Sequence, residues 1–308
     1  MSGATVISGA VQVLGGILLA PLLVGMVQWM KARLQGRRGA SPLQPYREIR
    51  RLWGKSGIDV EGTTVVYRAA PLVAAAALMV AVLLVPVTQI GPDLGVGHDA
   101  LVLAGLLALA RFAVALASWD VSNGFSLQGA SRDLMLSVFV EPVLVLALTV
   151  AALVAGTTDL AGMIAGTAGW HTWASPALAL GTAAFAMVIV AETGRQPVDN
   201  PDTHLELTMI HEGPLLEYGG RDLAFLQWGA AVRHWLVFVL AAEIFLPHPD
   251  GPWGQLAVLP AWLLGLAVAL AVLETLVAKM RTLLVPRLLG AASGVALLGI
   301  LAWLVGAA

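Results

Sequence analysis

The chain has 308 residues, of which 58% are hydrophobic and 12% charged, and its formal net charge is −2 at pH 7. A mean hydropathy of +0.84 excludes an ordinary soluble domain, and the near-balanced charge excludes a globally basic surface for nucleic acid. There is no cysteine, which excludes disulfides, thiolate metal sites and iron–sulfur clusters held by this chain. Any redox centre it works with must belong to a partner.

Apolar stretches long enough to cross a membrane recur along the sequence. About 20 apolar residues, each rising 1.5 Å, cross roughly 30 Å of hydrocarbon. The first stretch lacks a basic n-region and a small-residue cleavage site, so we interpret it as a span and not as a signal peptide. We predict an all-α integral membrane protein, one polytopic domain over 1–308. Its eight transmembrane helices are expected at about 6–30, 64–90, 100–118, 133–156, 172–192, 223–246, 254–277 and 284–306.

The basic residues lie in alternate loops between these spans. Of the 17 lysines and arginines, 14 fall in loops 31–63, 119–132, 193–222 and 278–287, whereas the intervening loops and both termini have none. Lysine and arginine are enriched in the cytoplasmic loops of membrane proteins. We therefore predict that the four charged loops face the cytoplasm and that both termini face outside.

Loop 31–63 combines a cluster of arginines, which includes Arg37 and Arg38, with an amphipathic helix. The apolar face of this helix consists of Tyr46, Ile49, Leu52 and Trp53. An interfacial helix on anionic lipid explains the pattern. The arginine cluster is also suited to dock an acidic cytoplasmic subunit.

Charged residues inside the spans are candidates for function. Arg111 and Arg233 lie near the middle of their spans, where an arginine costs about 2.5–3.5 kcal/mol, so each needs an anionic partner or a polar cavity. Glu141 precedes Pro142, whose missing N–H frees the carbonyl of Val138 and kinks the helix or admits water. We interpret Glu141 as a proton-relay position; the alternative is a structural ion pair with one of the two arginines.

Three further acids and one histidine are candidates for the same path. Glu243 lies ten residues from Arg233, about 15 Å along the helix axis, which is too far for a direct pair. Glu192 and Glu274 lie near cytoplasmic span ends, where snorkelling is the alternative explanation. His234 lies in the middle of its span, and no second axial histidine is placed to suggest haem. The candidates for a proton or ion path are Glu141, Glu192, Glu243, Glu274, Arg111, Arg233 and His234.

The acidic loop 193–222 is the most informative segment. Thr203 and Glu206 fit a capping box, which predicts a short helix from Thr203 to about Glu212. Capping alone does not explain the other charges of this proline-rich segment, so we expect it to fold back towards the bilayer and line a polar cavity. Nothing in the chain resembles a metal box, a nucleophile elbow or a phosphate loop, so we predict no catalytic residue and no metal site.

These loops resemble a known family. The series Glu192-Thr193-x-Arg195-x-Pro197-x-Asp199-x-Pro201, followed by Glu206-Leu207 and Glu217-Tyr218-x-Gly220, resembles the signature of subunit 1 (the H subunit) of respiratory NADH–quinone oxidoreductase. The stretch from Gln35 to Gly39 with Leu43, Gln44 and Pro45 resembles it too. The amino-acid sequence of residues 199–212 and 216–224 most resembles that of the equivalent subunit of formate hydrogenlyase and related group 4 membrane-bound nickel–iron hydrogenases.

The resemblance implies a non-catalytic subunit of an oxidoreductase complex in a prokaryotic cytoplasmic membrane. Such a subunit anchors a cytoplasmic redox arm, made of a hydrogenase-like large subunit and an iron–sulfur small subunit, and links it to antiporter-like membrane subunits and to proton or ion translocation. The nickel–iron centre and the iron–sulfur clusters would lie in those partners, and this chain would bind no cofactor. The implied redox-arm junction, a quinone-like cavity, consists of Arg37, Arg38, Gln44, Arg195, Asp199, Glu206, Glu212, Glu217 and Tyr218.

Two other functions stay open. A quinone-binding subunit 1 of respiratory NADH–quinone oxidoreductase would need a quinone-sized cavity and a flavin-containing partner arm. A stand-alone ion transporter would explain the buried charges but not the loop motifs, and the sequence has no obvious inverted repeat of the kind many transporters have.

Overall fold

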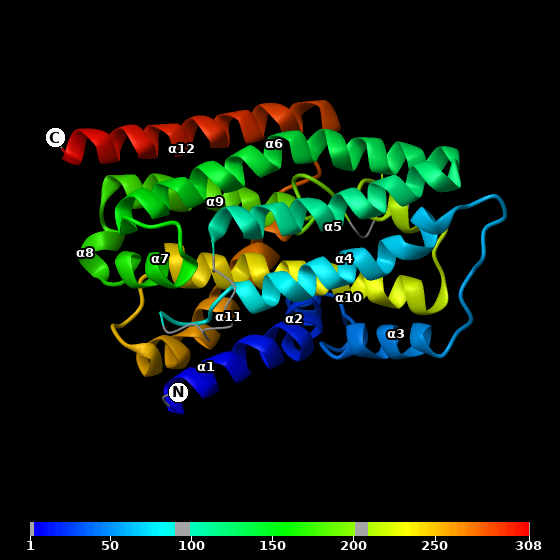
Figure 1. The fold of residues 1–308 in the computed structure, drawn as a ribbon, viewed down its shortest axis with the longest axis horizontal. Coiled ribbons are helices and arrows are strands. Elements are labelled where there is room, and N and C mark those ends of the chain that lie inside the picture. The colour runs from blue at the N-terminus through cyan, green and yellow to red at the C-terminus, as the bar shows by residue number, and fades with distance from the viewer. Residues whose placement is uncertain (1–2, 90–98, 201–208, 308) are drawn as a thin grey trace.

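The computed structural model describes residues 3–89, 99–200 and 209–307, and within these ranges the chain is a bundle of roughly parallel and antiparallel helices (Figure 1). The first rod consists of α1 (Gly3–Leu14), a π-helical turn η1 (Gly15–Leu19) and α2 (Ala20–Leu34). The remaining long helices are α3 (Gln44–Trp53), α4 (Val65–Leu84), α5 (Ala100–Val121), α6 (Gly124–Ala155), α9 (Pro176–Glu192), α10 (Gly220–Leu240), α11 (Pro252–Leu276) and α12 (Val285–Ala307). The short ones are α7 (Leu160–Thr167), α8 (Trp170–Trp173), η2 (Gly213–Leu215), η3 (Ala241–Phe245) and η4 (Thr282–Leu284).

Seven helical stretches of the described residues are long and apolar enough to cross a membrane. The remaining predicted span, the fifth at 172–192, corresponds to α9, which has 17 residues and so measures about 26 Å, near the lower limit for a span. The prediction of an all-α membrane fold with about eight spans is confirmed. Figure 1 shows the labels N and C at the same end of the bundle, as an even number of crossings requires.

Several predicted boundaries differ from the observed ones. The fourth span begins at Gly124 and not at 133, because Asn123 caps α6 by accepting a hydrogen bond from the backbone N–H of Phe125 at 2.9 Å. Ser122, with φ 56°, reverses the chain directly before it, so the expected loop 119–132 is a tight turn. The second span ends at Leu84, and α9 begins only at Pro176, after the separate helix α8.

The most enclosed span is α10 with η3, which packs against α2, α3, α4, α9 and α11. Every residue from His234 to Phe245 is buried. The Trp228 indole N–H donates to the carbonyl of Ile17 at 3.1 Å, which ties the π-helical turn of the first rod to α10. A helix enclosed in this way can hold polar side chains away from lipid, which is the position the charged residues of α10 require.

The connections at one end of the bundle carry most of the charge. We call this the charged end; it includes residues 35–64, 193–200, 209–219 and 277–281. Segment 277–281 is pinned to segment 193–200, since the Met280 N–H donates to the carbonyl of Pro197 at 2.8 Å. The turn η2 packs on α6 so closely that a Cβ built on Gly213 would lie 2.8 Å from the Cα of Gly129. These contacts fold the acidic loop back onto the spans.

Candidate functional site

Five charged side chains from four spans form one network near the charged end. We call it the intramembrane network; its members are Arg111 on α5, Asp133 and Glu141 on α6, Glu192 on α9 and Arg233 on α10. Glu192 Oε2 accepts hydrogen bonds from Arg111 Nη2 at 3.0 Å and from Arg233 Nη1 at 2.9 Å. Arg111 also lies 3.5 Å from Asp133 and 3.6 Å from Glu141. Both central arginines therefore have the anionic partner that their position demands.

Burial rules out snorkelling for Glu192 of this network and for the nearby Glu274. The side chain of Glu192 is 1% exposed and that of Glu274 is 0% exposed. Glu274 is paired with two cations, Lys31 Nζ at 3.6 Å and Arg195 Nη1 at 3.5 Å. Breaking a buried pair by removing one partner is costly because an uncompensated charge remains. These contacts join α2 and α11 to the segment that follows α9.

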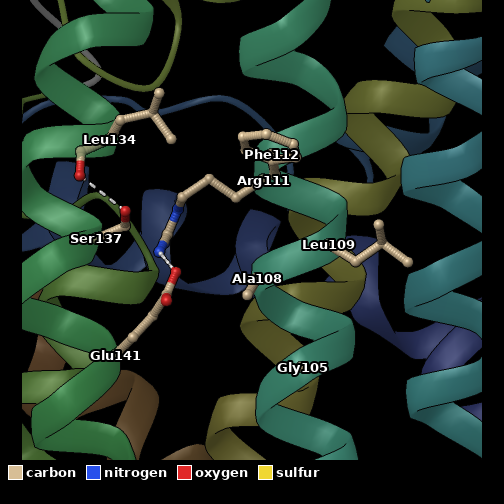
Figure 2. Close-up of a pocket in the computed structure, with 8 residues that line it drawn as sticks. All are labelled: Gly105, Ala108, Leu109, Arg111, Phe112, Leu134, Ser137 and Glu141. Carbon is tan, nitrogen blue, oxygen red and sulfur yellow. Dashed lines mark hydrogen bonds and ion pairs between the residues drawn. The ribbon is translucent and has the colours of Figure 1, made fainter.

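Glu141 differs from the other members because it reaches the outer surface of the bundle. Its side chain is 38% exposed and lines a cavity of about 350 Å³ in the groove between α5 and α6. Figure 2 shows Arg111 extending from α5 towards the Glu141 carboxylate of α6, with Phe112 and Leu134 nearby. We call this the lateral cavity. The ion pair that was the alternative interpretation of Glu141 is present, and its proton-relay role stays a prediction.

A second cavity of about 700 Å³ lies between the helices and the acidic loop at the charged end. Residues of α2, α3, α4 and α10 supply the apolar part of its wall. Its charged groups are Glu48 of α3, Arg111 of α5, Asp133 of α6, Glu192 of α9, Arg233 of α10 and several residues of the acidic loop. We call this the main cavity. The predicted junction residues that line it are Gln44, Arg195, Asp199, Glu212 and Tyr218, and the path candidates that line it are Arg111, Glu192, Arg233 and His234.

Asp199 holds the acidic loop together at the mouth of the main cavity. One carboxylate oxygen accepts from Lys279 Nζ at 2.7 Å; the other lies 3.0 Å from His211 Nδ1 and accepts from the His211 backbone N–H at 3.3 Å. Burial alone would favour the neutral acid, but the hydrogen bonds from His211 and Lys279 prevail and hold the pKa of Asp199 well below its usual range. Asp199 is therefore an anion that joins the acidic loop to the segment before α12.

His211 lies between two carboxylates. Its Nδ1 faces Asp199, and its Nε2 lies 3.7 Å from Asp133 Oδ1 on α6. Burial disfavours the charged imidazolium, but the Asp199 hydrogen bond and the charges of Asp133 and Asp199 outweigh this effect and raise the pKa of His211. Gly194, with φ +60°, lies against the ring, and a Cβ built on it would be 2.9 Å from Nδ1. Glycine is required there both for the left-handed backbone and for the close approach.

Glu217 and Tyr218 act as structural clamps. The Tyr218 hydroxyl donates to the Tyr67 carbonyl at 2.9 Å, the Tyr67 hydroxyl donates to the Glu217 carbonyl at 2.8 Å, and the two rings stack with centroids 4.5 Å apart. Burial raises the pKa of Tyr218, so its hydroxyl stays a donor. The Glu217 carboxylate accepts from Asn123 Nδ2 at 2.5 Å, at the turn between α5 and α6.

Other predicted site residues lie elsewhere. Arg37 and Arg38 are exposed and do not line the main cavity, and Glu206 lies outside the described residues. The predicted helix ending near Glu212 was wrong at that end, because residues 209–212 are not helical and Glu212 instead precedes the 3-10 turn η2. Glu243 is 3% exposed on η3, in the opposite half of the bundle, and within the described chain it makes no ion pair.

Sequence reasoning missed four members of these networks: Lys31, Asp133, His211 and Lys279. Asp133 lies at the predicted start of the fourth span, where a charged residue needs no buried partner. The two lysines lie in predicted loops, where a charge is expected to be solvated. His211 stood inside the recognised motif, immediately before Glu212, and a titratable ring within so many acids was the signal that could have identified it.

Comparisons with known proteins agree with this arrangement. The family model described as NADH dehydrogenase matches residues 8–305. The chain is 33% identical over 300 residues to formate hydrogenlyase subunit 4 of Escherichia coli (strain K12), covering 94% of this chain and 95% of that protein. It is 36% identical over 234 residues to hydrogenase-4 component C of the same strain, covering 75% of this chain and 72% of that protein.

A solved structure supports the fold independently. The membrane-bound sulfane sulfur reductase, described as an archaeal respiratory membrane complex, contains a chain that matches with a TM-score of 0.83. The match covers 97% of this chain and 99% of the other at 20% sequence identity, so it bears on the fold alone. By its family match and its full-length similarity, the chain belongs to the NADH dehydrogenase subunit 1 family, together with formate hydrogenlyase subunit 4 and hydrogenase-4 component C.

Proposed function

We propose that this protein is the membrane-anchoring and coupling subunit of a formate hydrogenlyase or related membrane-bound nickel–iron hydrogenase complex. One observation carries the proposal: the full-length similarity to formate hydrogenlyase subunit 4 coincides with a buried charge network that runs from the acidic loop to the lateral cavity. An anchor alone would not need ionisable groups in the middle of its spans, where they are costly.

The charged end supplies the docking surface for the redox arm in this proposal. A hydrogenase-like large subunit and an iron–sulfur small subunit would contact it, and would hold the nickel–iron centre and the clusters. Antiporter-like membrane subunits would contact the face with the lateral cavity, where Glu141 is half-exposed at the level of the spans. A change of charge at the nearest cluster would shift the proton affinities of the coupled carboxylates and start proton or ion movement.

The proposed sidedness rests on the distribution of basic residues. The charged end would face the cytoplasm of a prokaryote and both termini the outside. Reporter fusions to either terminus should be active only in the outer compartment, and a cytoplasmic signal from both would contradict this orientation.

The decisive experiment is to purify the chain in mild detergent with the proteins that copurify. We expect nickel in the preparation together with hydrogen:viologen activity. Flavin with NADH:quinone activity, and no nickel, would instead support the second candidate, the quinone-binding subunit. That candidate is favoured by one observation: the main cavity, at about 700 Å³ with an apolar wall, lies within the roughly 300–1,000 Å³ range of small-molecule sites.

A further inference from the structure

The contacts of His211 connect two charge networks of the described chain. On one side is the pair of Asp199 and Lys279 at the mouth of the main cavity. On the other is the intramembrane network, entered through Asp133. His211 Nδ1 is 3.0 Å from Asp199 and His211 Nε2 is 3.7 Å from Asp133.

We propose that His211 is the proton-exchanging link between the acidic loop and the intramembrane network, and that its protonation state is communicated to the spans through Asp133. This role deepens the proposed coupling function and rests on it. The geometry suits the role because one ring nitrogen faces each carboxylate, and the ring lines the main cavity with 27% of its side chain exposed.

The proton transfer balances with N–H and O–H bonds alone. In the neutral ring, the N–H at Nδ1 keeps its proton and donates a hydrogen bond to the Asp199 carboxylate, so that the lone pair on Nε2 faces the Asp133 carboxylate. Nε2 of His211 and Oδ1 of Asp133 are two acceptors 3.7 Å apart with no proton between them, and both residues line the main cavity, from which water supplies the proton. Uptake at Nε2 gives the imidazolium; release of that proton to Asp133 restores the neutral ring.

The charge on Asp133 then affects the ion pairs that Arg111 makes inside the spans. Asp133 lies 3.5 Å from Arg111 Nε, and the same guanidinium pairs with Glu192 and Glu141. Protonation of Asp133 removes one of the three negative charges near Arg111. The electrostatic attraction of Arg111 for the other two, Glu141 and Glu192, then increases. The change of charge caused by one proton at His211 thus reaches Glu141 through three contacts: His211 with Asp133, Asp133 with Arg111, and Arg111 with Glu141.

The surroundings of this histidine favour its protonated form. The groups facing it are Asp199 from the acidic loop, Asp133 from α6 and Arg111 from α5, while Lys279 and Arg132 act one contact away through Asp199 and the Met209 carbonyl. The two carboxylates outweigh burial and Arg111, and raise the pKa of the ring. Glu212 is the neighbouring acid in the chain and also lines the main cavity.

Two measurements on the purified complex test the inference. The first is histidine hydrogen–deuterium exchange followed by mass spectrometry, which reports the pKa of each histidine without any activity. We expect the midpoint of His211 to lie above that of an ordinary histidine and to fall in the Asp133→Asn variant. His171, exposed on α8 at the opposite end of the bundle, is the internal control and should not move. A His211 midpoint that is ordinary and unaffected by Asp133→Asn overturns the inference.

The second measurement is the ratio of protons moved to hydrogen formed in proteoliposomes. We expect His211→Gln to lower this ratio by at least about tenfold, since loss of a positioned acid–base group typically costs roughly 100- to 10,000-fold in a chemical step, and to flatten its pH dependence. The matched control His171→Gln should keep the wild-type ratio. An unchanged ratio in His211→Gln overturns the inference while the proposed function stands. A wild-type complex without nickel and hydrogen activity overturns the proposed function, and the exchange measurement still decides whether His211 and Asp133 share a proton.

Discussion

The two halves of the bundle treat their buried polar groups in opposite ways. At the charged end, acids are buried with arginines and lysines, as in the pairing of Glu192 with Arg111 and Arg233. In the other half, the polar groups are mostly neutral: Ser8 bonds Thr88 at 2.8 Å, and Gln12 donates to the Val82 carbonyl at 2.8 Å. Glu243, a buried acid of that half, has a carboxylate oxygen without a hydrogen-bond partner among the described residues.

His248 illustrates the contrast with His211. Its Nε2 lies 2.9 Å from the Glu243 carbonyl and must donate, so Nδ1 accepts from Gln255 Nε2 at 3.1 Å. Both ring nitrogens are thus satisfied in one neutral tautomer. His211 instead faces two carboxylates. The comparison teaches that charge can be redistributed at the charged end, whereas the opposite half is built to keep its polar groups fixed.

The largest expected effect comes from removing a cation of the intramembrane network. Arg111→Met leaves Glu192, Asp133 and Glu141 short of a partner, and we expect a loss of about 3–5 kcal/mol in the free energy of unfolding. Thermal unfolding in detergent should show a midpoint lower by roughly 6–10 °C. The control Arg68→Met, exposed on α4, should stay close to wild type. Equal midpoints for the two variants would show that the buried pairs do not stabilise the fold.

The next effect concerns coupling and not stability. Glu141→Gln keeps the size of the side chain but removes the titratable group at the lateral cavity. We expect the complex to assemble and proton movement per turnover to fall by about tenfold. Glu61→Gln, in the exposed loop before α4, is the control. Full ion translocation in the Glu141 variant would exclude it from the path.

A smaller effect is expected in the opposite half. Glu243→Gln replaces a buried carboxylate that has no ion pair within the described chain, so no cation is left unpaired. We expect the free energy of unfolding to change by less than about 1 kcal/mol, or to rise, as the desolvation cost of a carboxylate is relieved. A loss as large as that of Arg111→Met would mean that the two halves do not differ in the way described.

The smallest effect is the pH dependence of stability from the His211 and Asp199 pair. The pKa of His211 is raised in the folded protein, so its contribution is complete below the unfolded value of 6.5 and is lost as the pH rises through the folded value. The pKa of Asp199 is lowered, so its contribution is present above the unfolded value of 3.8 and is lost on acidification. Unfolding midpoints should fall above pH 6.5 in wild type and change less in His211→Gln. Parallel curves for the two proteins would contradict this linkage.

Hydropathy and charge were sufficient to predict the membrane fold, because the bilayer demands long apolar helices whatever their packing. They also predicted that Arg111 and Arg233 need anions. They could not select Glu192 as the common partner, since it lies 81 residues from Arg111 and the meeting of α5, α9 and α10 depends on helix packing. The role of Asp133 was hidden because the cap at Asn123, which extends α6 by a full two turns, was not recognised.

The contact between Gly129 of α6 and Gly213 of η2 has a consequence for how this sequence can evolve. A Cβ on Gly129 would lie 2.7 Å from the Cα of Gly213, and a Cβ on Gly213 would meet Gly129 at 2.8 Å. Compensation between neighbours usually works by shrinking one residue when the other grows. Here both positions already hold the smallest residue, so neither can be rescued by the other. We therefore expect that neither position tolerates substitution. Related proteins that pack η2 against α6 in this way should have glycine at both positions.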